Sequence, residues 1–390
     1  MKNEKTSKNN DIINLKKDSK TINYKYYIIP LFIFIILNLT VVFHIGRYNN
    51  KNISKIEKEN HVLLSQKEEK TNEISEEFKQ SLRNILNEKE MIENELMSKH
   101  TTFRIGGPAK LFLKPSTIEQ IVQIIKLCKK YGVHYFILGN GSNLLVSDEG
   151  YKGVVLYIHQ SNFGSFEYTK DDETHYTLKV GAGMLMKELS IQACFLSLKD
   201  LDDIVDIPGT VGGGVIMHAT AYSQGLSKPL YKVKVITPEG EILELTKEEC
   251  QFRLRGSMLK DKKYLVIEAI FKCETGDQLK IQKQMTENTR KRYSNQPIYF
   301  LSAGCFFVYN HAKHGSLLEK YRACNLVSYQ VGDVMVYTDN ISFIVNMGKG
   351  TAKDVMAVVN HIKKTIKEKY NIDLDQEVIS IGNFDGIEYY

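Results

Sequence analysis

Three glycine-rich loops, each beside a strand-like segment, limit most strongly what this chain can form. They read GNGSN at 139–143, GAG at 181–183 and PGTVGGG at 208–214. Glycine lets a backbone approach a ligand closely and adopt positive φ, and the amides of such loops can point at phosphate oxygens. None of the three is a GxGxxG fingerprint or a Walker loop. Together they favour a dinucleotide pyrophosphate site over three unrelated turns.

The residues around these loops mix helical and strand-like patterns. Residues 118–131 carry apolar residues at helical spacing, with Thr117 placed as the N-cap and Gly132 as the C-terminal stop. A second helix is expected over about 186–196. Strand-like segments lie at 134–138, 144–147, 153–158, 177–180, 232–237, 241–245 and 264–272. Helices and strands in this mixed order indicate the α+β class.

An uncharged apolar run occupies residues 26–46 (YYIIPLFIFIILNLTVVFHIG). As a helix it would extend for roughly 31 Å, which matches a hydrocarbon core about 30 Å thick. Its lysine-rich flanks argue against a buried core helix, and a cleaved signal peptide would have a shorter apolar core. We therefore expect a single transmembrane helix, preceded by a basic tail over residues 1–25. The lysines of this tail slightly favour a tail inside the cell and a large domain outside.

Residues 47–97 are expected to form a helical stalk. From residue 51 onward the segment is charged and lacks Gly and Pro. Its apolar residues follow steps of 3, 4 and 7 at Ile74, Phe78, Leu82, Ile85, Ile92 and Leu96. Such spacing places a narrow apolar seam along one face of a helix. Two interpretations stay open: a coiled coil that pairs two chains as a homodimer, or a single helix that rests on the following domain.

Charge and cysteine usage exclude other classes of protein. The net charge of +6 is mild, and no basic face with interleaved aromatic residues points to nucleic acid. The cluster Arg290–Arg292 is predicted to be a solvated helix face. The six cysteines have neither CxxC nor zinc-finger spacing, so no metal site is expected. Their dispersal in a chain of this length favours a reducing compartment.

Eight motifs stand in the order found in one enzyme family. They are FRIGGPA at 103–109, ILGNGSNLLVSDEGYKGVVL at 137–156, VGAG at 180–183, IPGTVGG at 207–213, RKRYSNQP at 290–297, SAGCFF at 302–307, FIVN at 343–346 and QEVISIG at 376–382. With these motifs, residues from about 98 to 390 resemble the UDP-N-acetylenolpyruvoylglucosamine reductase (MurB) family. The resemblance implies a FAD-binding fold of the vanillyl-alcohol-oxidase (PCMH) type over residues 98–275. It also implies a smaller α+β substrate domain over residues 276–390, which ends in a return segment.

The resemblance further implies a reaction and its cofactors. FAD would be the cofactor, NADPH the reductant, and a UDP-sugar the substrate. The enolpyruvyl ether of UDP-N-acetylglucosamine would be reduced to UDP-N-acetylmuramate, a step of peptidoglycan precursor synthesis. An active enzyme would need its globular domain in the cytoplasm, against the charge bias of the membrane flanks. The implied FAD-binding residues are Gly139, Asn140, Gly141, Ser142, Asn143, Gly183, Pro208, Gly209, Thr210, Gly212 and Gly213.

The chemistry of this reduction needs a fixed cation near the substrate carboxylate and an acid that protonates the α-carbon. By resemblance these needs fall on Arg255 in FRLRGS, Cys305 in SAGCFF and Glu377 in QEVISIG. Cys305 stands where most relatives carry the serine proton donor. A thiol with a pKa of about 8.5 is mostly protonated at neutral pH and is a stronger acid than an alcohol. Glu377 would assist enolate stabilisation or proton delivery.

Several positions in the substrate half depart from the family pattern. They are His218, Thr220 and Ser223 in MHATAYS where the family tends to have MNAGAYG, Leu254 in place of tyrosine, Val308 in place of lysine, and Tyr337 and Asn340 in place of a serine and a histidine. A site built on hydrogen bonds loses about 1–3 kcal/mol for each missing partner. Two functions therefore stay open: a reductase of this family, or a membrane-tethered flavoprotein with lost or altered catalysis that acts as a scaffold or sensor.

Overall fold

The protein is described by a computed structural model over residues 74–221 and 224–389. The predicted basic tail, the predicted transmembrane helix at 26–46 and the stalk up to residue 73 lie outside these residues. Within the described part of the chain, no helix is both long and apolar enough to cross a bilayer.

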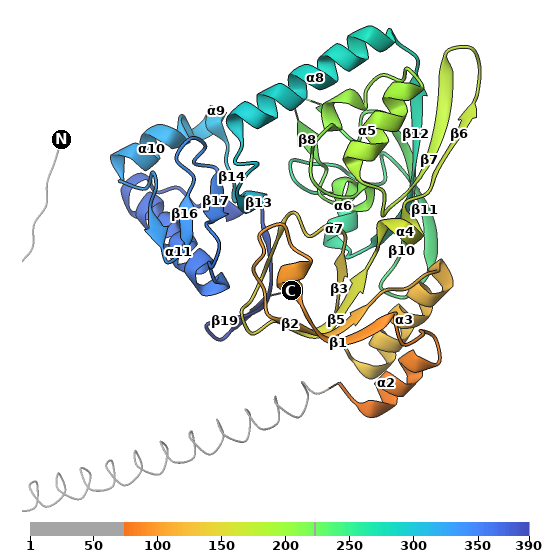
Figure 1. Ribbon diagram of the computed structural model, residues 1–390, viewed down its shortest axis with the longest axis horizontal. Helices are drawn as coiled ribbons and strands as arrows, with labels where there is room; N and C mark the ends of the chain where they lie inside the picture. Colours follow the sequence, from red (N-terminus) through yellow and green to blue (C-terminus); the bar gives the residue numbers. More distant parts are fainter. Residues whose placement is uncertain (1–73, 222–223, 390) are drawn as a thin grey trace, which may run out of the picture. The chain divides into compact units, whose positions relative to one another are not determined.

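The first sheet contains β3, which leads into the glycine-rich loop at 139–143 (Figure 1). Its strand order is β1-β2-β5-β3, with β1 antiparallel to β2 and the other pairs parallel. The strands are β1 (Met91–Leu96), β2 (Pro108–Leu113), β3 (Tyr135–Leu138) and β5 (Tyr151–Tyr157). Strands β2 and β3 lie on either side of β5 and are both parallel to it, so a crossover must join them. Helix α3 (Ile118–Tyr131) provides it.

The second sheet is antiparallel throughout, in the order β11-β10-β12-β7-β6. Its strands are β6 (Phe166–Lys170), β7 (His175–Gly181), β10 (Leu230–Ile236), β11 (Ile242–Thr246) and β12 (Leu265–Glu274). The helical segments around it are α4 (Gln160–Phe163), α5 (Met186–Phe195), η2 (Asp202–Ile204), α6 (Val211–Ile216) and α7 (Met258–Asp261). The short pair β8 (Thr220–Ala221) and β9 (Gln224–Gly225) follows α6.

Helix α8 (Gln278–Asn295) leads from β12 to the carboxyl-terminal part of the fold (Figure 1). That part contains an antiparallel sheet in the order β13-β17-β16-β15, made of β13 (Leu301–Cys305), β15 (Gln330–Val331), β16 (Val334–Val336) and β17 (Phe343–Asn346). Its helices are α9 (His311–His314), α10 (Leu317–Ala323) and α11 (Ala352–Tyr370). Strands β14 (Phe307–Val308), directly after β13, and β18 (Asp375–Gln376), after α11, pair with each other.

The chain finally returns to the amino-terminal half. Strand β19 (Ile379–Phe384) pairs in parallel with β4 (Leu144–Val146), and β20 (Ile387–Tyr389) pairs with β19. Asn143 closes this junction, because its backbone carbonyl accepts from the amide of Ile379 at 3.1 Å. Its side-chain Nδ2 donates to the carbonyl of Glu377 at 3.0 Å. One glycine-rich loop is thereby tied to the QEVISIG motif.

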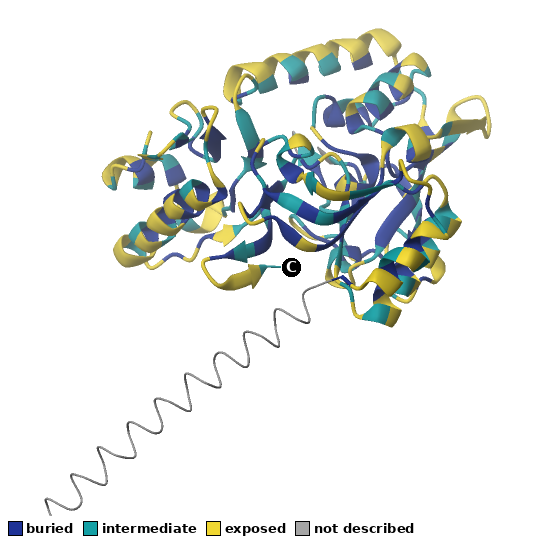
Figure 2. Ribbon diagram, turned by 60° about the horizontal axis from the view of Figure 1, so that its bottom comes forward, coloured by how far each residue is buried: buried dark blue, intermediate teal, exposed yellow. Residues whose placement is uncertain are grey.

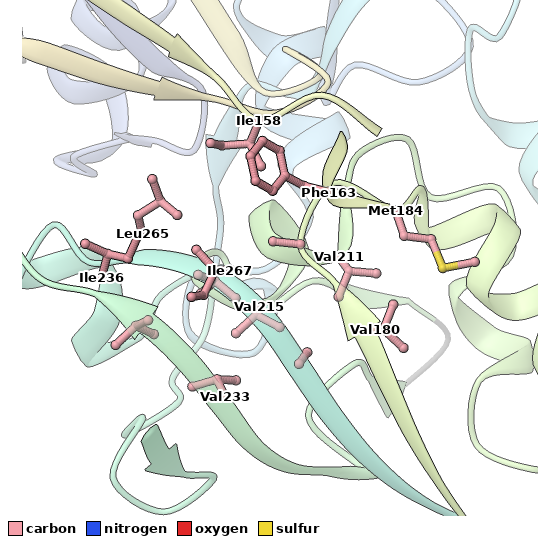
Figure 3. Close-up of a cluster of buried hydrophobic side chains, with 14 of the residues drawn as sticks. Ile158, Phe163, Val180, Met184, Val211, Val215, Val233, Ile236, Leu265 and Ile267 are labelled. Carbon is pink, nitrogen blue, oxygen red and sulfur yellow. The ribbon is translucent and has the colours of Figure 1, made fainter. Parts of the chain in front are cut away.

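Buried side chains form separate apolar cores in the two halves (Figure 2). In the amino-terminal half, Val180 of β7, Val233 of β10 and Ile267 of β12 lie in the same cluster as Val215 of α6 (Figure 3). In the carboxyl-terminal half, α11 buries one face, including Val355, Val359 and Ile362, against α10 and the sheet formed by β13, β17, β16 and β15. The smaller third cluster joins side chains of β2, β3 and β5 with side chains of β4 and β19.

The predicted helix over 118–131 is confirmed as α3, including its ends. Thr117 Oγ1 accepts from the amide of Gln120, and Gln120 Oε1 accepts from the amide of Thr117. These two hydrogen bonds form a capping box. Gly132 ends the helix with φ of 66°, in the left-handed region that glycine adopts most easily.

The predicted continuous stalk over 47–97 is wrong in its described part. Only α2 (Glu76–Arg83) is an α-helix there, whereas Met91–Leu96 form strand β1, paired with β2 from Met91 opposite Leu113 to Leu96 opposite Pro108. The side chains of Phe78 and Leu82 are fully buried in the core of their own chain, so this part of the seam is not available to a second chain. The expected domain start at residue 98 is therefore too late. Strand pairing overrides the helical spacing because both patterns fit so short an apolar run.

Candidate active site

A cavity of about 860 Å³ connects the glycine-rich loops with the carboxyl-terminal part. This volume is near the upper end of the roughly 300–1,000 Å³ typical of small-molecule sites. The wall includes residues 139–143, 208–210 and 212–214, the end of α8 with residues 295–298, and residues 302–305 in and around β13. Arg255 and Glu377 complete it.

Two of the glycine-rich loops touch each other at the cavity. A Cβ added at Gly139 would lie 2.7 Å from Thr210 Oγ1, so only glycine fits without displacement. Ser142 Oγ donates to the carbonyl of Pro208 at 3.0 Å. Thr210 Oγ1 in turn accepts from the amide of Gly213 at 3.3 Å. The loops around 139–143 and 208–213 therefore form one continuous rim.

The rim fits a ligand with phosphate groups. Within the described residues, the backbone amides of Asn140, Gly141 and Ser142 donate to no protein acceptor. Gly141 has φ of 62°, and a Cβ there would lie 2.1 Å from the carbonyl of His100, so the loop needs glycine to take this course. Three successive free amides in such a loop are a common anion cradle. These residues fit the expected FAD.

Ten of the eleven predicted FAD-binding residues line the cavity, and Gly183 does not. Its amide donates to the carbonyl of Phe163 at 2.8 Å. A Cβ at Gly183 would lie 2.9 Å from the carbonyl of His159. This glycine therefore permits close packing against α4, while its neighbour Ala182 reaches the cavity wall.

Arg255 lies at the tip of a tight turn. Arg253 and Gly256 exchange two backbone hydrogen bonds, of 3.0 and 3.2 Å, which leaves Leu254 and Arg255 as the turn residues. Arg255 has φ of 56°, a conformation rare for a residue with a long side chain. Its Nε lies 3.1 Å from Glu377 Oε1, and its Nη1 donates to Thr220 Oγ1 at 3.3 Å. Two of the three residues implied to be catalytic thus form an ion pair.

Glu377 lies between β18 and β19. Its amide donates to the carbonyl of Phe306 at 2.9 Å, and its own carbonyl accepts from Asn143. Burial raises the pKa of the Glu377 carboxyl above its ordinary value, and the positive charges of Arg255 and Lys260 oppose that shift. A carboxyl in this state can hold a proton more readily than a solvated glutamate.

Cys305 ends β13, directly before Phe306. Burial raises the pKa of its thiol to about 11, with a further contribution from the negative charge of Glu377. The positive charges of Arg255 and Arg292 act in the opposite direction. The thiol is therefore protonated at neutral pH. Arg255, Cys305 and Glu377 all line the same cavity, beside the glycine-rich rim.

The departures from the family pattern have different positions. Thr220 and Asn340 line the cavity, and Asn340 Nδ2 donates to the carbonyl of Asn295 at 2.8 Å. Leu254 is 68% exposed and lies outside the lining, as does Tyr337, whose hydroxyl donates to Asp339. Val308 pairs with Asp375 between β14 and β18 and does not line the cavity either. Ser223 lies outside the described residues.

Several cavity cations were missed by the sequence reasoning. Lys291 and Arg292 line the cavity, so the cluster Arg290–Arg292 is not wholly a solvated helix face as predicted. The signal that could have placed them at the site is the motif RKRYSNQP, which contains both residues and is part of the family resemblance. Lys260 also lines the cavity, and burial lowers the pKa of its ammonium group, followed by the charge of Arg253. These cations favour an anionic ligand.

Comparisons with known proteins agree with this architecture. A family model described as a FAD binding domain matches residues 109–246. A second, described as the C-terminal domain of UDP-N-acetylenolpyruvoylglucosamine reductase, matches residues 296–381. The fold and the glycine-rich rim thus define a FAD-dependent oxidoreductase with an α+β composition.

Full-length relatives narrow this class to one family. The UDP-N-acetylenolpyruvoylglucosamine reductase of Clostridium botulinum (strain Alaska E43) is 35% identical over 300 residues, which cover 77% of this chain and 95% of the relative. That of Clostridium perfringens (strain SM101) is 36% identical and covers 78% and 98%. The crystal structure of the Thermus caldophilus enzyme, MurB, superposes with a TM-score of 0.62 at 29% identity, covering 75% of this chain and 98% of that one. The chain belongs to the UDP-N-acetylenolpyruvoylglucosamine reductase family.

Proposed function

We propose that this protein reduces the enolpyruvyl ether of UDP-N-acetylglucosamine to UDP-N-acetylmuramate, with FAD as cofactor and NADPH as reductant. The observation that carries the proposal is that Arg255, Cys305 and Glu377 line one cavity together with the glycine-rich rim. FAD, when bound along that rim, supplies the hydride chemistry. Arg255 supplies the cation, and Cys305 and Glu377 supply the acids.

Arg255 would bind the substrate carboxylate and stabilise the negative charge that develops on it. A guanidinium stays charged and offers several donors in a fixed plane, of which Nε and Nη1 already have partners. Within the described residues its Nη2 has no protein acceptor. Charge stabilisation by a preorganised donor in a shielded site is a major source of rate acceleration.

Cys305 would hold the proton that the α-carbon receives. Its thiol is neutral at working pH because the pKa lies near 11. Glu377, with its pKa raised by burial, would share in proton delivery or, in its protonated form, donate a hydrogen bond to the enolate. A positioned general acid contributes typically about 10²- to 10⁴-fold to the rate.

The colour of the purified 390-residue chain tests the reaction. The protein should be yellow, NADPH should bleach it under anaerobic conditions, and the enolpyruvyl UDP-sugar should then restore the colour. Bleaching without recovery would contradict the reductase and favour the scaffold or sensor function. A colourless protein that FAD cannot reconstitute would contradict both.

We also propose that residues 26–46 anchor the enzyme in the membrane with the globular domain on the cytoplasmic side. NADPH and UDP-sugars are cytoplasmic, so this side is required by the proposed reaction even though the flanking lysines slightly favour the other. Fusions at the carboxyl terminus should give fluorescence from a cytoplasmic reporter and no activity from alkaline phosphatase, which is active only when exported. The reverse pattern would contradict the proposed reaction as well as the orientation.

A further inference from the structure

Two side chains after α6 converge on the turn that presents Arg255. His218 and Thr220 both stand where the family pattern has other residues. His218 Nδ1 lies 2.9 Å from the carbonyl oxygen of Arg253, and Thr220 Oγ1 lies 3.3 Å from Arg255 Nη1. We propose that His218 and Thr220 are positioning residues, which fix the Arg255 guanidinium where the substrate carboxylate must bind. This proposal rests on the proposed reductase function.

The turn itself needs support from outside. Its two backbone hydrogen bonds join Arg253 and Gly256, and Arg255 is held at φ of 56° between them. A residue with a Cβ in this region persists only when the surroundings over-determine its conformation. Leu254, the other tip residue, is largely exposed and provides little packing. The Arg253 side chain holds one end of the turn through its ion pair with Asp261, and further support acts through the backbone of Arg253 and the Arg255 side chain.

His218 supplies the contact with the backbone. A carbonyl only accepts, so Nδ1 of His218 must carry the proton and donate to the Arg253 carbonyl. In the neutral ring Nε2 then accepts from the Ser227 hydroxyl, at 2.8 Å. The ring also lies against Phe252, with centroids 4.9 Å apart and planes at 33°. Held on both nitrogens and on one face, the imidazole provides a fixed donor at the base of the turn.

Thr220 supplies the contact with the side chain. Its hydroxyl accepts from Nη1 at 3.3 Å, and Glu377 Oε1 forms an ion pair with Nε at 3.1 Å, so partners lie at two edges of the guanidinium. Thr220 also lines the cavity, as do Arg255 and Glu377. The family pattern has glycine here, which has no side chain to offer. The two departures thus act on one group, and they explain how the cation keeps its place although Leu254 has replaced the usual tyrosine.

The two half-reactions separate positioning from general damage to the fold. In the full chain, His218→Ala should slow reoxidation by the enolpyruvyl UDP-sugar by about tenfold or more, since small misplacements of a catalytic group have effects up to about 10²-fold. Bleaching by NADPH should be unchanged. Arg255→Ala removes the cation completely and should therefore give the largest slowing of reoxidation. Thr220→Val should slow reoxidation less than His218→Ala does. His175→Ala, an exposed histidine paired with Asp172, is the matched control and should behave as the wild type.

Rescue by a conservative variant provides the decisive comparison. In His218→Asn the amide nitrogen takes the place of Nδ1 and can still donate to the Arg253 carbonyl, and asparagine tolerates the φ of 47° found at this position. This variant should recover most of the reoxidation rate. Wild-type reoxidation in His218→Ala, or a His218→Asn variant as slow as His218→Ala, would overturn the proposal.

A second measurement does not depend on turnover. With 15N-labelled arginine, exchange of the Arg255 Nε proton with water should be slow in the wild type, because Nε is ion-paired with the largely buried Glu377 carboxylate. Exchange should be faster in His218→Ala and restored in His218→Asn. Unchanged exchange in His218→Ala overturns the positioning role. If the wild type fails to recover its colour with the sugar while exchange responds as expected, the proposed reaction fails and the positioning of Arg255 stands.

Discussion

Replacing Cys305 by alanine should reduce the rate of reoxidation by the enolpyruvyl UDP-sugar by about 10²- to 10⁴-fold, the usual contribution of a positioned general acid. Bleaching by NADPH should continue, because Cys305 is proposed to act only on the α-carbon of the substrate. Rapid mixing of the reduced protein with the sugar, followed at the flavin absorbance, measures the effect. An alanine variant that reoxidises as fast as the wild type would remove Cys305 from the mechanism.

Serine at this position is the matched control. Most relatives carry serine there, so Cys305→Ser should retain most of the rate. The two proteins should differ at high pH: the wild-type rate should fall as pH rises through about 11, where the thiol loses its proton. The rate falls rather than rises with pH because the neutral thiol is the active form. The serine variant should not show that decline, since a hydroxyl keeps its proton there.

A protein that begins at residue 98 should fail to fold stably, whereas one that begins at residue 74 should fold. The shorter protein lacks Phe78, Leu82, Leu86 and Met97, all of which are buried. Each such side chain stabilises by about 1.5–3 kcal/mol when fully buried, against a total stability of about 5–15 kcal/mol for a domain. Loss of β1 also leaves β2 as an unpaired edge, which promotes aggregation. Soluble yield and thermal unfolding of the two proteins measure the difference.

The longer protein is also the control for the amino-terminal residues. Because it keeps every buried side chain from Ile74 onward, its melting temperature should equal that of the full chain. Equal melting of the proteins that begin at 74 and at 98 would mean that α2 and β1 are dispensable, contrary to their packing.

Local signals in the sequence were sufficient where a feature depends on neighbouring residues. Thr117, the apolar spacing and Gly132 define α3 without help from the rest of the fold. The loop 139–143 differs, because the groups that require its glycines are distant in sequence: Thr210 Oγ1 for Gly139 and the carbonyl of His100 for Gly141. Likewise, nothing local indicates that Arg255 pairs with Glu377, because that contact depends on the return of β19 to β4. Only the family resemblance linked the two residues.

The predictions from the sequence were wrong where one sequence pattern fits two different structures. Ile92 and Leu96 fit a helical seam, yet pairing with β2 places them on a strand. The basic residues Lys291 and Arg292 suggest a solvated surface by composition, and their position at the end of α8 brings them to the cavity. Gly183 belongs to a glycine-rich motif, but its need for glycine comes from contact with α4.

The pairing of β4 with β19 has a consequence for how the protein is made. It joins residues more than 230 positions apart in sequence, and Glu377 lies immediately before the returning strand. Closing so long a segment is entropically unfavourable, and contacts of such separation form late and slowly in folding. On the ribosome, the glycine-rich rim is complete long before Glu377 has been synthesised. A partially synthesised chain can therefore possess its glycine-rich loops while lacking Glu377 of the proposed catalytic set, and we expect it to reduce substrate only after β19 is in place.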